Sequence, residues 1–481
     1  MLLIDVAIGL GFCWLCVILL NQCLSPKRSL LVNIPGPPPL PVVGNVLEMM
    51  GDPLVAFAQY RKTYGPIFKY YYFTDPVVVI SDPAFVKTVL NTNSSHFDKD
   101  RDPVITAVIG HGLLLANGEP WKRQRKIMRM VPCFVEVTRT LLNIWKELPP
   151  EPINLHIYMT KVTLDVIGIS GFGYAFNSLQ DSQGLLPTAV STILLQTEER
   201  IFQTASWWKI PFLPSSRRFN HAKAVLLGEI RAMIKMRKES DEDLQNAKDL
   251  LGRLLAAEDP DTHERLDENQ LADELITFLI AGHETTAASL AFTCYLLSQH
   301  PDVEQKVIDE IDEIIGTGEP TYDDIQKLKY LPMVMKESMR LFPSVSMQTT
   351  RITNQDTSLE KDGLVYHLPK GTYVEVWPWL LHRADDLWDD PLTFNPERFA
   401  SGSFSYKYTP FGEGPRNCIG QNLALMESKV VLVMIYQHYR LRLGPGAEMK
   451  PQLSITLRPA GLLMQLIPRR PDEKKKCFKL L

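Results

Sequence analysis

The middle of this 481-residue sequence lacks a linker, because no stretch rich in serine, glycine or charge interrupts it. Chains of this length usually divide into two or three domains. Without a linker, we predict one large folded unit behind a separate N-terminal segment. No internal repeat of roughly 20 to 50 residues is visible, although repeat architectures require one. The net charge is only −4 and the isoelectric point is near 6.2, so we expect no nucleic acid as a partner.

Cysteine is also scarce and unpatterned. The seven cysteines lie at positions 13, 16, 23, 133, 294, 418 and 477 and form no disulfide framework. Cys13 and Cys16 have the CxxC spacing of a redox dithiol, but they lie in an apolar run, where a dithiol would lack water and partners. We therefore interpret them as ordinary residues of a helix face.

Charge is almost absent from the N-terminus, where Asp5 is the single charged residue among the first 20. Twenty helical residues span about 30 Å, enough to cross the hydrocarbon core of a bilayer. A cleaved signal peptide is the alternative, but neither a basic start nor a small-residue cleavage site is clear. We predict a transmembrane anchor at residues 1–21, and the following Lys27 and Arg28 place the remaining chain in the cytosol.

A basic and proline-rich segment follows at residues 22–42 and includes Ile34-Pro35-Gly36-Pro37-Pro38-Pro39-Leu40-Pro41. Its prolines lack amide donors and favour a stiff, extended backbone. The segment suits a hinge that directs the rest of the chain, residues 43–481, away from the membrane.

Strand patterns are few. Residues 67–73 and 76–80 are rich in aromatic and β-branched side chains, and with Thr74-Asp75 between them they predict a β-hairpin. Short strands are expected again at Tyr373–Val376 and Ser454–Leu457. Most of the remaining chain has helical patterns, so the sequence predicts a mainly α fold with a minor β region.

A glycine-rich loop that bears an arginine precedes Cys418, and an apolar run with a helical pattern follows: Phe411-Gly412-Glu413-Gly414-Pro415-Arg416-Asn417-Cys418-Ile419-Gly420. A helix N-terminus and nearby positive charge both lower the pKa of a cysteine. A cysteine that ligates haem iron binds as the thiolate anion. The pattern therefore predicts Cys418 as an iron ligand; a buried, inert core cysteine is the alternative.

Five positions of this loop, Phe411, Gly414, Arg416, Cys418 and Gly420, resemble the haem-binding signature of the cytochrome P-450 family. The resemblance implies haem b with Cys418 as the axial thiolate ligand and the other four residues in cofactor binding. It also implies the cytochrome P-450 fold behind an N-terminal transmembrane helix.

The longest predicted helix runs from Leu266 to about Gln299, since the residue before a proline disfavours helix and Pro301 follows. Histidine is the other common haem ligand, and two candidates lie near the motifs, His111 and, on this helix, His283. His283 lies about 200° around the helix axis from Ala281, which argues against it as a ligand. We predict that neither histidine binds iron.

This helix contains Ala281-Gly282-His283-Glu284-Thr285-Thr286. Gly282 costs about 1 kcal/mol relative to alanine in a helix interior, and its missing side chain leaves room for a flat cofactor. The motif resembles the family's oxygen-activation segment. The resemblance implies that Glu284 and Thr285 are catalytic in proton delivery and that Ala281 and Gly282 lie beside the haem. The alternative is a small-residue helix crossing with Thr285 bonded to a backbone carbonyl.

Glu337 and Arg340 are three residues apart and share a helix face, and Phe394-Asn395-Pro396-Glu397-Arg398-Phe399 supplies a second arginine. A glutamate that bridges two guanidiniums makes charge-assisted hydrogen bonds, which fix geometry more than they add stability. The order of these residues resembles the family's Glu-x-x-Arg and Pro-Glu-Arg-Phe motifs. The resemblance implies that Glu337, Arg340 and Arg398 form a structural lock beneath the cysteine loop, with no catalytic role.

Trp121 and Arg125 lie one helical turn apart on a basic stretch. By resemblance they bind the haem propionates, with Arg351 and Arg416 as further partners. A solvated basic helix face is the alternative, and exposed lysines and arginines there would attract an acidic electron donor.

Residues 207–214, Trp-Trp-Lys-Ile-Pro-Phe-Leu-Pro, place aromatic side chains beside basic ones, which suits a membrane interface. A buried loop between helices is the alternative. In the family, the corresponding region often dips into lipid and roofs the substrate pocket. By order along the chain, the pocket is expected to draw on Phe278, Ala281, Val345, Met347 and the Asp102 to Leu115 segment.

These motifs occur along the whole chain in the family's order, and the chain resembles eukaryotic microsomal members, broadly those that hydroxylate fatty acids and sterols. The resemblance implies a membrane-anchored haem-thiolate monooxygenase of the endoplasmic reticulum, with its catalytic domain facing the cytosol. It would insert one oxygen atom from dioxygen into a lipophilic small molecule. Its electrons would come from NADPH through NADPH–cytochrome P-450 reductase, with cytochrome b5 as an optional donor. Two alternatives stay open: an isomerase or dehydratase that acts on peroxides, and a non-catalytic haem-binding sensor or carrier.

Overall fold

The computed structural model describes residues 31–100, 102–110, 114, 131–181, 184–201, 207–240, 249–258, 265–348, 350–402 and 404–469. The predicted anchor, the hinge up to residue 30, His111 and the pair Trp121 and Arg125 lie outside these ranges. The chain forms two compact units. Unit 1 comprises Met1–Asp100, Ser346–Leu392 and Ser403–Cys418, and unit 2 comprises Arg101–Val345, Thr393–Gly402 and Ile419–Leu481.

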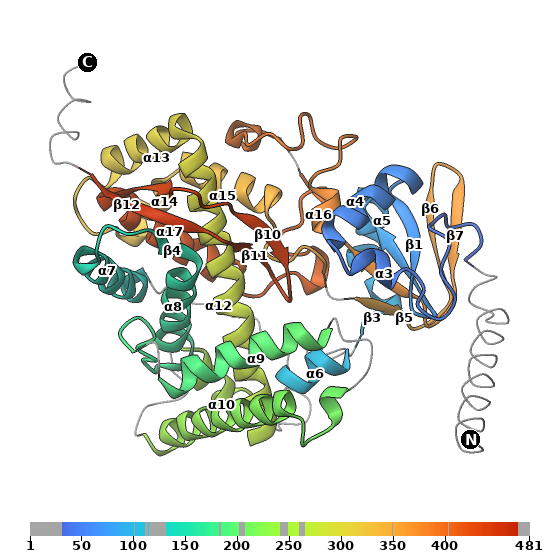
Figure 1. The fold of residues 1–481 in the computed structure, drawn as a ribbon, viewed down its shortest axis with the longest axis horizontal. Helices are drawn as coiled ribbons and strands as arrows, with labels where there is room; N and C mark the ends of the chain where they lie inside the picture. Colours follow the sequence, from blue (N-terminus) through green and yellow to red (C-terminus); the bar gives the residue numbers. More distant parts are fainter. Residues whose placement is uncertain are drawn as a thin grey trace, which may run out of the picture. The chain divides into compact units, whose positions relative to one another are not determined.

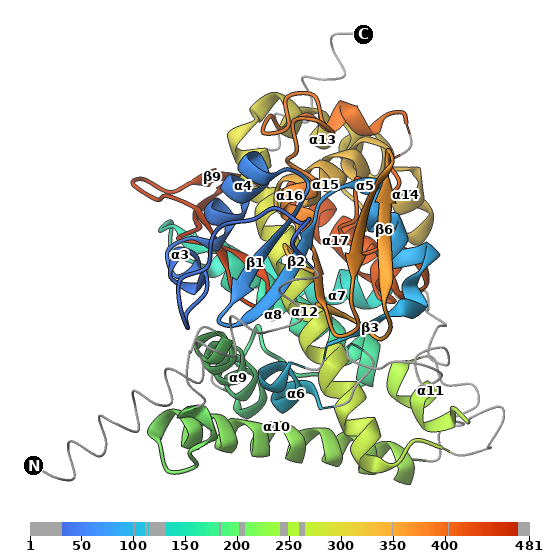
Figure 2. The same ribbon diagram turned by 90° about the vertical axis from the view of Figure 1, so that its right-hand side faces the viewer.

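Unit 1 is built around a five-stranded sheet of order β1-β2-β8-β5-β3. Its strands are β1 (Ile67–Tyr72), β2 (Asp75–Ile80), β3 (Phe97–Lys99), β5 (Arg351–Thr353) and β8 (Tyr373–Val376). β1 and β2 form the predicted antiparallel hairpin, with Ile67 opposite Ile80 (Figure 2). β8 runs parallel to β2 and pairs Tyr373 with Val77. The predicted hairpin and the predicted strand at Tyr373–Val376 are therefore confirmed.

Short helices and a second hairpin complete unit 1. They are α3 (Val46–Met49), α4 (Pro53–Tyr64), α5 (Pro83–Lys87), α16 (Pro378–Leu381), the turns Thr88–Thr92, Ser94–His96 and Gly414–Arg416, and the strands β6 (Thr357–Lys361) and β7 (Leu364–Leu368). α4 and α5 each begin with an aspartate cap followed by proline: Asp52 accepts the N–H of Leu54 at 2.9 Å, and Asp82 that of Ala84 at 2.9 Å. These caps fix where the short helices start.

Unit 2 is mainly helical (Figure 1). Its helices are α6 (Pro103–Ile109), α7 (Val131–Glu147), α8 (Leu155–Ile167), α9 (Leu185–Ile201), α10 (Pro214–Glu239), α11 (Leu250–Ala256), α12 (Glu268–Gln299), α13 (Pro301–Ile314), α14 (Tyr322–Lys327), α15 (Tyr330–Leu341) and α17 (Gln421–His438), with short turns at Gly168–Phe172, Trp207–Lys209 and Pro396–Phe399. α12 packs along α8, α9 along α10, and α7 along α17. The prediction of a mainly α fold with a minor β region is confirmed.

α12 passes through the apolar core of unit 2. Asp267 caps it through a capping box: its carboxylate accepts the N–H of Gln270 at 2.9 Å, and the Gln270 side chain accepts the N–H of Asp267 at 2.9 Å. The helix therefore starts at Glu268, just after the predicted Leu266, and ends at Gln299 as predicted. Among the described residues, α12 is the one helix long and apolar enough to cross a membrane, with 67% of its most apolar window buried. Such burial is typical of a core helix.

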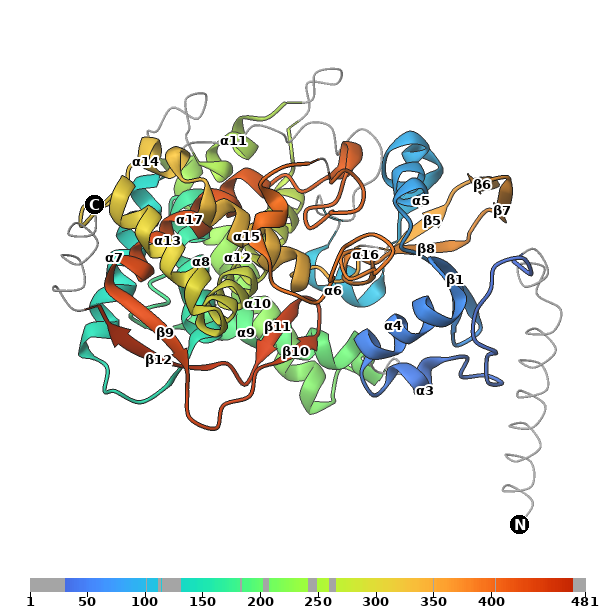
Figure 3. The same cartoon turned by 90° about the horizontal axis from the view of Figure 1, so that it is seen from above.

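Two small sheets complete unit 2, one of order β4-β12-β9 and one of order β10-β11. Figure 3 shows β9 and β12 of the first and both strands of the second. Their strands are β4 (Ile153–Asn154), β9 (Tyr439–Leu443), β10 (Lys450–Leu453), β11 (Leu457–Ala460) and β12 (Leu463–Pro468). The predicted strand at Ser454–Leu457 is wrong. Residues 454–456 form the turn between β10 and β11, in which the Ser454 N–H donates to the Thr456 carbonyl at 3.0 Å. The β-branched Ile455 and Thr456 produced a strand pattern, but the hairpin reverses there.

Candidate active site

Cys418 lies just after the short turn Gly414–Arg416, and its backbone N–H donates to the Phe411 carbonyl at 2.7 Å. α17 begins at Gln421, so a helix N-terminus follows the loop, as the sequence predicts. No residue from Phe411 to Gly420 is buried, and the Cys418 side chain is exposed. A loop in which a thiol and a phenylalanine stay partly exposed can bind a cofactor.

Two glycines shape this loop differently, although both have positive φ: 70° at Gly412 and 71° at Gly414. A Cβ on Gly414 would lie 2.1 Å from the Leu90 carbonyl oxygen, whereas a Cβ on Gly412 would meet no atom closer than Asn417 Cα at 3.7 Å.

We expect Gly414→Ala to lower both Tm and cofactor content strongly. Gly412→Ala should cost only the left-handed strain of about 1–2 kcal/mol. Equal losses in thermal unfolding and cofactor absorbance would show that the contact with Leu90 does not shape the loop.

The other two cysteines that the structure describes have the opposite setting. Burial raises the pKa of Cys133 to about 12 and the pKa of Cys294 to about 12. A thiol that stays protonated at neutral pH is a poor metal ligand. Of the described cysteines, Cys418 is thus the one placed to act as a ligand, and the alternative of a buried core cysteine does not describe it.

Cationic side chains gather around Cys418 within unit 1. Lys99 on β3 lies opposite Arg351 on β5, and both side chains are buried. Burial and the charges of Arg351 and Arg416 lower the pKa of Lys99 to about 7, while Cys418 opposes the shift. Burial, reinforced by the charge of Arg416, lowers the pKa of Arg351 to about 10, while Asp98 opposes it. The site therefore concentrates positive charge away from water.

This cation cluster, Lys99, Arg351 and Arg416, fits a ligand that carries carboxylates. Nη1 of Arg351 is buried without a hydrogen-bond partner, and a carboxylate would satisfy it with a charge-assisted bond. Haem, whose propionates are carboxylates, fits such a site beside a thiolate. Sequence reasoning named Arg351 and Arg416 but missed Lys99, because only strand register places Lys99 opposite Arg351.

In unit 2, α12 leaves one narrow stripe open along its buried middle. The stripe consists of Phe278, Ala281, Thr285 and Ser289, each partly or fully exposed, whereas most neighbouring residues are buried. The spacing of three and four residues puts these side chains on one helix face. The small residues that sequence analysis assigned to cofactor contact thus include Ala281 on the uncovered side of the helix.

Thr285 and Gly282 each have a local contact. The Thr285 hydroxyl donates to the Ala281 carbonyl at 2.8 Å, and the Ser344 hydroxyl donates to the Thr285 carbonyl at 2.8 Å. The backbone bond expected in the alternative interpretation is therefore present, yet Thr285 keeps its place on the open stripe. A Cβ on Gly282 would lie 3.3 Å from Ile167 Cδ1, so the missing side chain permits close contact with α8.

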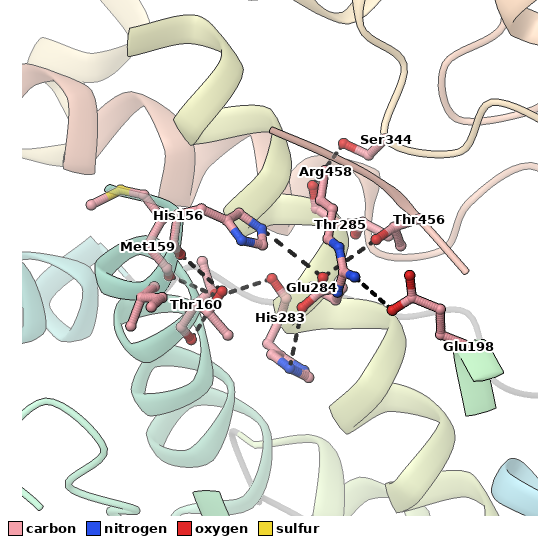
Figure 4. Close-up of polar contacts among 12 residues, drawn as sticks. His156, Met159, Thr160, Glu198, His283, Glu284, Thr285, Ser344, Thr456 and Arg458 are labelled. Atoms are coloured by element: carbon pink, nitrogen blue, oxygen red, sulfur yellow. Dashed lines mark hydrogen bonds and ion pairs between the residues drawn. The ribbon is translucent and has the colours of Figure 1, made fainter. Parts of the chain in front are cut away.

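Glu284 extends into the interior of unit 2, toward α8 and the turn before β11 (Figure 4). The Thr456 hydroxyl donates to Oε1 of Glu284 at 3.4 Å. Nε2 of His156 lies 4.0 Å from Oε1, and Nε2 of His283 lies 3.9 Å from Oε2. The fully buried His283 ring bonds the Leu279 carbonyl through Nδ1 at 2.6 Å. Its enclosure agrees with the prediction that His283 is not an iron ligand.

The structure brings the three predicted lock residues together within unit 2. Arg340 binds Glu337 through Nε at 2.7 Å and through Nη2 at 2.9 Å, and Arg398 Nε binds Glu337 at 3.1 Å. The Asn395 N–H also donates to Glu337, at 2.9 Å. Glu337 and Arg340 are fully buried, so the carboxylate holds the Thr393–Gly402 segment against α15.

A second buried carboxylate was missed. Glu304 on α13 is fully buried and binds Arg440 at 3.0 Å and Arg442 at 2.7 Å, both on β9. The closer of these arginines in sequence lies 136 residues away, and no sequence motif links them. These two ion pairs join α13 to β9, just as the lock joins α15 to the Pro396–Phe399 turn.

The aromatic loop at residues 207–214 is partly open. Phe212 is 71% exposed, whereas Trp208 is partly buried with the Arg200 guanidinium 5.4 Å from its ring centre. The neighbouring Ser216 hydroxyl donates to the Trp208 carbonyl at 2.9 Å. The loop thus combines an anchored tryptophan with an exposed phenylalanine.

The exposed thiolate ligand candidate, its glycine-rich loop and the buried cations define the class of site: a haem-thiolate centre. The chain belongs to the cytochrome P450 family, because the family model described as Cytochrome P450 matches residues 34–466. Proteins of this family bind haem b through a cysteine thiolate and use a reductase partner, and the chain is a cytochrome P450 monooxygenase, an oxidoreductase.

Relatives of this chain occur in bacteria, plants and animals. It is 31% identical over 465 residues to the bifunctional cytochrome P450/NADPH–P450 reductase of Bacillus cereus, with 91% of this chain and 42% of that protein covered. It is 32% identical over 419 residues to the chloroplastic protein LUTEIN DEFICIENT 5 of Arabidopsis thaliana, covering 80% and 69%. It is 32% identical over 482 residues to human cytochrome P450 3A5, covering 92% and 90%.

Proposed function

We propose that this chain inserts one oxygen atom from dioxygen into a lipophilic small molecule, with Cys418 as the axial thiolate ligand of haem b. The observation that carries the proposal is the exposed Cys418 beside the cation cluster of unit 1, in which Lys99 and Arg351 are buried. Arg351, Lys99 and Arg416 would hold the propionates, and the open loop residues Phe411, Gly414 and Gly420 would line the cofactor. Trp121 and Arg125 remain predicted propionate partners.

When bound, haem supplies the centre at which dioxygen is activated. The chain's own residues would hold the cofactor in place and deliver protons. Cys418 would bind the iron as the thiolate anion, which the nearby positive charge of Arg416 and Lys99 would stabilise. Glu284 would relay protons from its buried position, and Thr285 offers a hydroxyl on the open stripe of α12. Ala281, whose side chain is small, leaves space on the same stripe, whereas the missing side chain of Gly282 permits the close contact with α8.

The membrane placement belongs to this proposal. Residues 1–21 would form a single-pass anchor, residues 22–42 the hinge and residues 43–481 the catalytic domain on the cytosolic side of the endoplasmic reticulum. NADPH–cytochrome P-450 reductase would supply electrons, with cytochrome b5 as an optional donor. Two Bacillus relatives carry a P450 and an NADPH–P450 reductase in one protein, which supports a reductase of that class as partner. Exposed Phe212 supports lipid contact at the loop 207–214.

Reconstitution tests this proposal. The full chain in vesicles, with reductase and NADPH, is expected to convert a lipophilic substrate to a product that carries one oxygen atom from labelled dioxygen. Candidate fatty acids, sterols and terpenoids are first screened by the spectral change that accompanies displacement of the iron-bound water. Full activity on a hydroperoxide without reductase, together with no label from dioxygen, would instead identify a peroxide isomerase or dehydratase.

Thr285→Val is expected to consume NADPH at close to the normal rate while product per NADPH falls at least about tenfold, since general acid catalysis contributes about 10²–10⁴-fold. Thr286→Val is the matched control. The Thr286 hydroxyl makes the same backbone bond, to the Gly282 carbonyl at 2.9 Å, but its side chain is buried away from the open stripe. Equal coupling losses in both variants would assign the effect to helix geometry and remove the proton-delivery role of Thr285.

A further inference from the structure

Two buried histidine nitrogens flank Glu284 without any hydrogen-bond partner. They are Nε2 of His156, on the first turn of α8, and Nε2 of His283, on α12. Their distances to the carboxylate, 4.0 Å and 3.9 Å, exceed a direct hydrogen bond but need only a small side-chain rotation to close (Figure 4). Buried polar atoms are normally satisfied, so two unsatisfied nitrogens at one carboxylate ask for an explanation.

His283 has a fixed tautomer. Its Nδ1 bonds the Leu279 carbonyl at 2.6 Å, and because a carbonyl only accepts, Nδ1 carries the proton. Burial lowers the pKa of His283, which keeps the ring neutral near pH 7. Its Nε2 therefore presents a lone pair to Glu284, and a hydrogen bond between them requires the proton to come from the carboxyl. His283 is thus placed to accept a hydrogen bond from Glu284 whenever that carboxyl carries a proton.

His156 differs in its access to solvent. Its side chain is 15% exposed although Nε2 is buried, so another edge of the ring reaches solvent while Nε2 faces Glu284. Burial lowers the pKa of His156; the Glu284 carboxylate opposes this shift, and the charges of Arg458 and His283 reinforce it. A neutral imidazole can accept a proton at one nitrogen and release one from the other.

The charged groups around His156 and Glu284 come from the elements packed against them. From α12 come Glu284 and His283, and from β11 comes Arg458. Arg458 is bound at 2.6 Å by Glu198 of α9, so its charge is compensated at the partly exposed rim and does not pair with Glu284. The Glu284 carboxyl thus keeps His156 and His283 as its nearest titratable neighbours, with the Thr456 hydroxyl on Oε1.

We propose that His156 is the proton-relay residue that recharges Glu284 from solvent, while His283 positions the carboxyl to receive and release that proton. The inference rests on the proposed function, since it requires Glu284 to deliver protons. A proton that arrives at the exposed edge of the His156 ring displaces the proton on Nε2 to Glu284 Oε1, and Glu284 passes its proton on toward the open stripe. No electrons move in these steps. His156 acts through Glu284 and is not itself a catalytic residue.

The first test uses the full chain loaded with haem and reconstituted with reductase. His156→Phe removes the ring nitrogens, and His156→Gln keeps a polar group that cannot conduct a proton. Both are expected to lower kcat at least about tenfold, to increase the solvent deuterium isotope effect and to leave KM unchanged. Thr163→Val is the structural control, because the Thr163 hydroxyl on α8 donates to the His283 carbonyl at 2.9 Å and touches no proton path. It should lower Tm while the isotope effect stays normal.

A second test does not depend on turnover. In the carbon-monoxide complex of the reduced protein labelled with ¹⁵N-histidine, His156 is assigned by its loss in His156→Gln. Its pKa should lie below the ordinary histidine value of about 6.5 and fall further in Glu284→Gln, because the carboxylate charge that raises it is lost. If the pKa of His156 is the same in Glu284→Gln as in the wild type, the relay is overturned. It is also overturned if the His156 variants keep a normal kcat and a normal isotope effect. If Glu284→Gln itself leaves kcat and product per NADPH normal, the proposed role of Glu284 fails instead.

Discussion

Cys418→Ser is expected to abolish the thiolate-shifted Soret band of the reduced carbon-monoxide complex and all NADPH-dependent product formation. A serine hydroxyl stays protonated at neutral pH and cannot replace the anionic sulfur that pushes electron density toward O–O cleavage. The protein should still fold, since Cys418 is exposed and its structural bond to Phe411 is made by the backbone. The measurement is the reduced carbon-monoxide difference spectrum of purified protein, with haem content determined separately.

Cys133→Ser provides the matched control. Burial holds the pKa of Cys133 at about 12, so this thiol is not a competing ligand, and the shifted band should persist in the variant. A band retained in Cys418→Ser, or lost in Cys133→Ser with haem still bound, would place the thiolate ligand elsewhere in the chain.

Glu337→Gln is expected to lower the free energy of unfolding by about 3–5 kcal/mol, the usual cost of removing one partner from a buried ion pair. The substitution leaves the fully buried Arg340 guanidinium without its carboxylate and weakens the bond to Arg398. Because the Thr393–Gly402 segment is held against α15 by these contacts, we also expect faster loss of haem on mild heating. Urea unfolding followed by tryptophan fluorescence and by Soret absorbance measures both effects.

Glu397→Gln tests whether burial is the reason. Glu397 lies beside Arg398 in the same short turn and binds Lys306 at 2.6 Å, but both side chains are about half exposed. Exposed ion pairs contribute little to stability, so this variant should unfold at nearly the wild-type urea concentration. If Glu337→Gln behaved like Glu397→Gln, the buried triad would have no role as a lock.

Much of the site could be predicted because its residues lie in short, ordered motifs. Cys418 and its glycines occupy ten consecutive positions, and the lock combines a helical i, i+3 pair with a six-residue segment. Such residues can be predicted from sequence, because each residue's partner is a neighbour in sequence or belongs to the same motif. The hairpin at Ile67–Tyr72 and Asp75–Ile80 was predictable for the same reason.

The residues that were missed depend on distant packing. Lys99 becomes part of the cation cluster only because β3 pairs with β5. His156 meets Glu284 only because α8 packs along α12, and Glu304 meets its arginines only across α13 and β9. A single histidine, lysine or glutamate carries no sequence signal of such a partner. The wrong strand at Ser454–Leu457 has a related origin, since β-branched residues favour strands wherever the chain does not turn.

The parallel pairing of β2 with β8 dictates an order of events during synthesis. Val77 cannot find Tyr373 until nearly three hundred further residues have been made, and Lys99 waits similarly for Arg351. The sheet of unit 1 therefore stays incomplete on the ribosome with β2 unpaired on one side, and such an unpaired edge strand is prone to aggregation. Cys418 is made only after all five strands of that sheet, so the chain can bind haem through this residue only once the whole sheet has been synthesised.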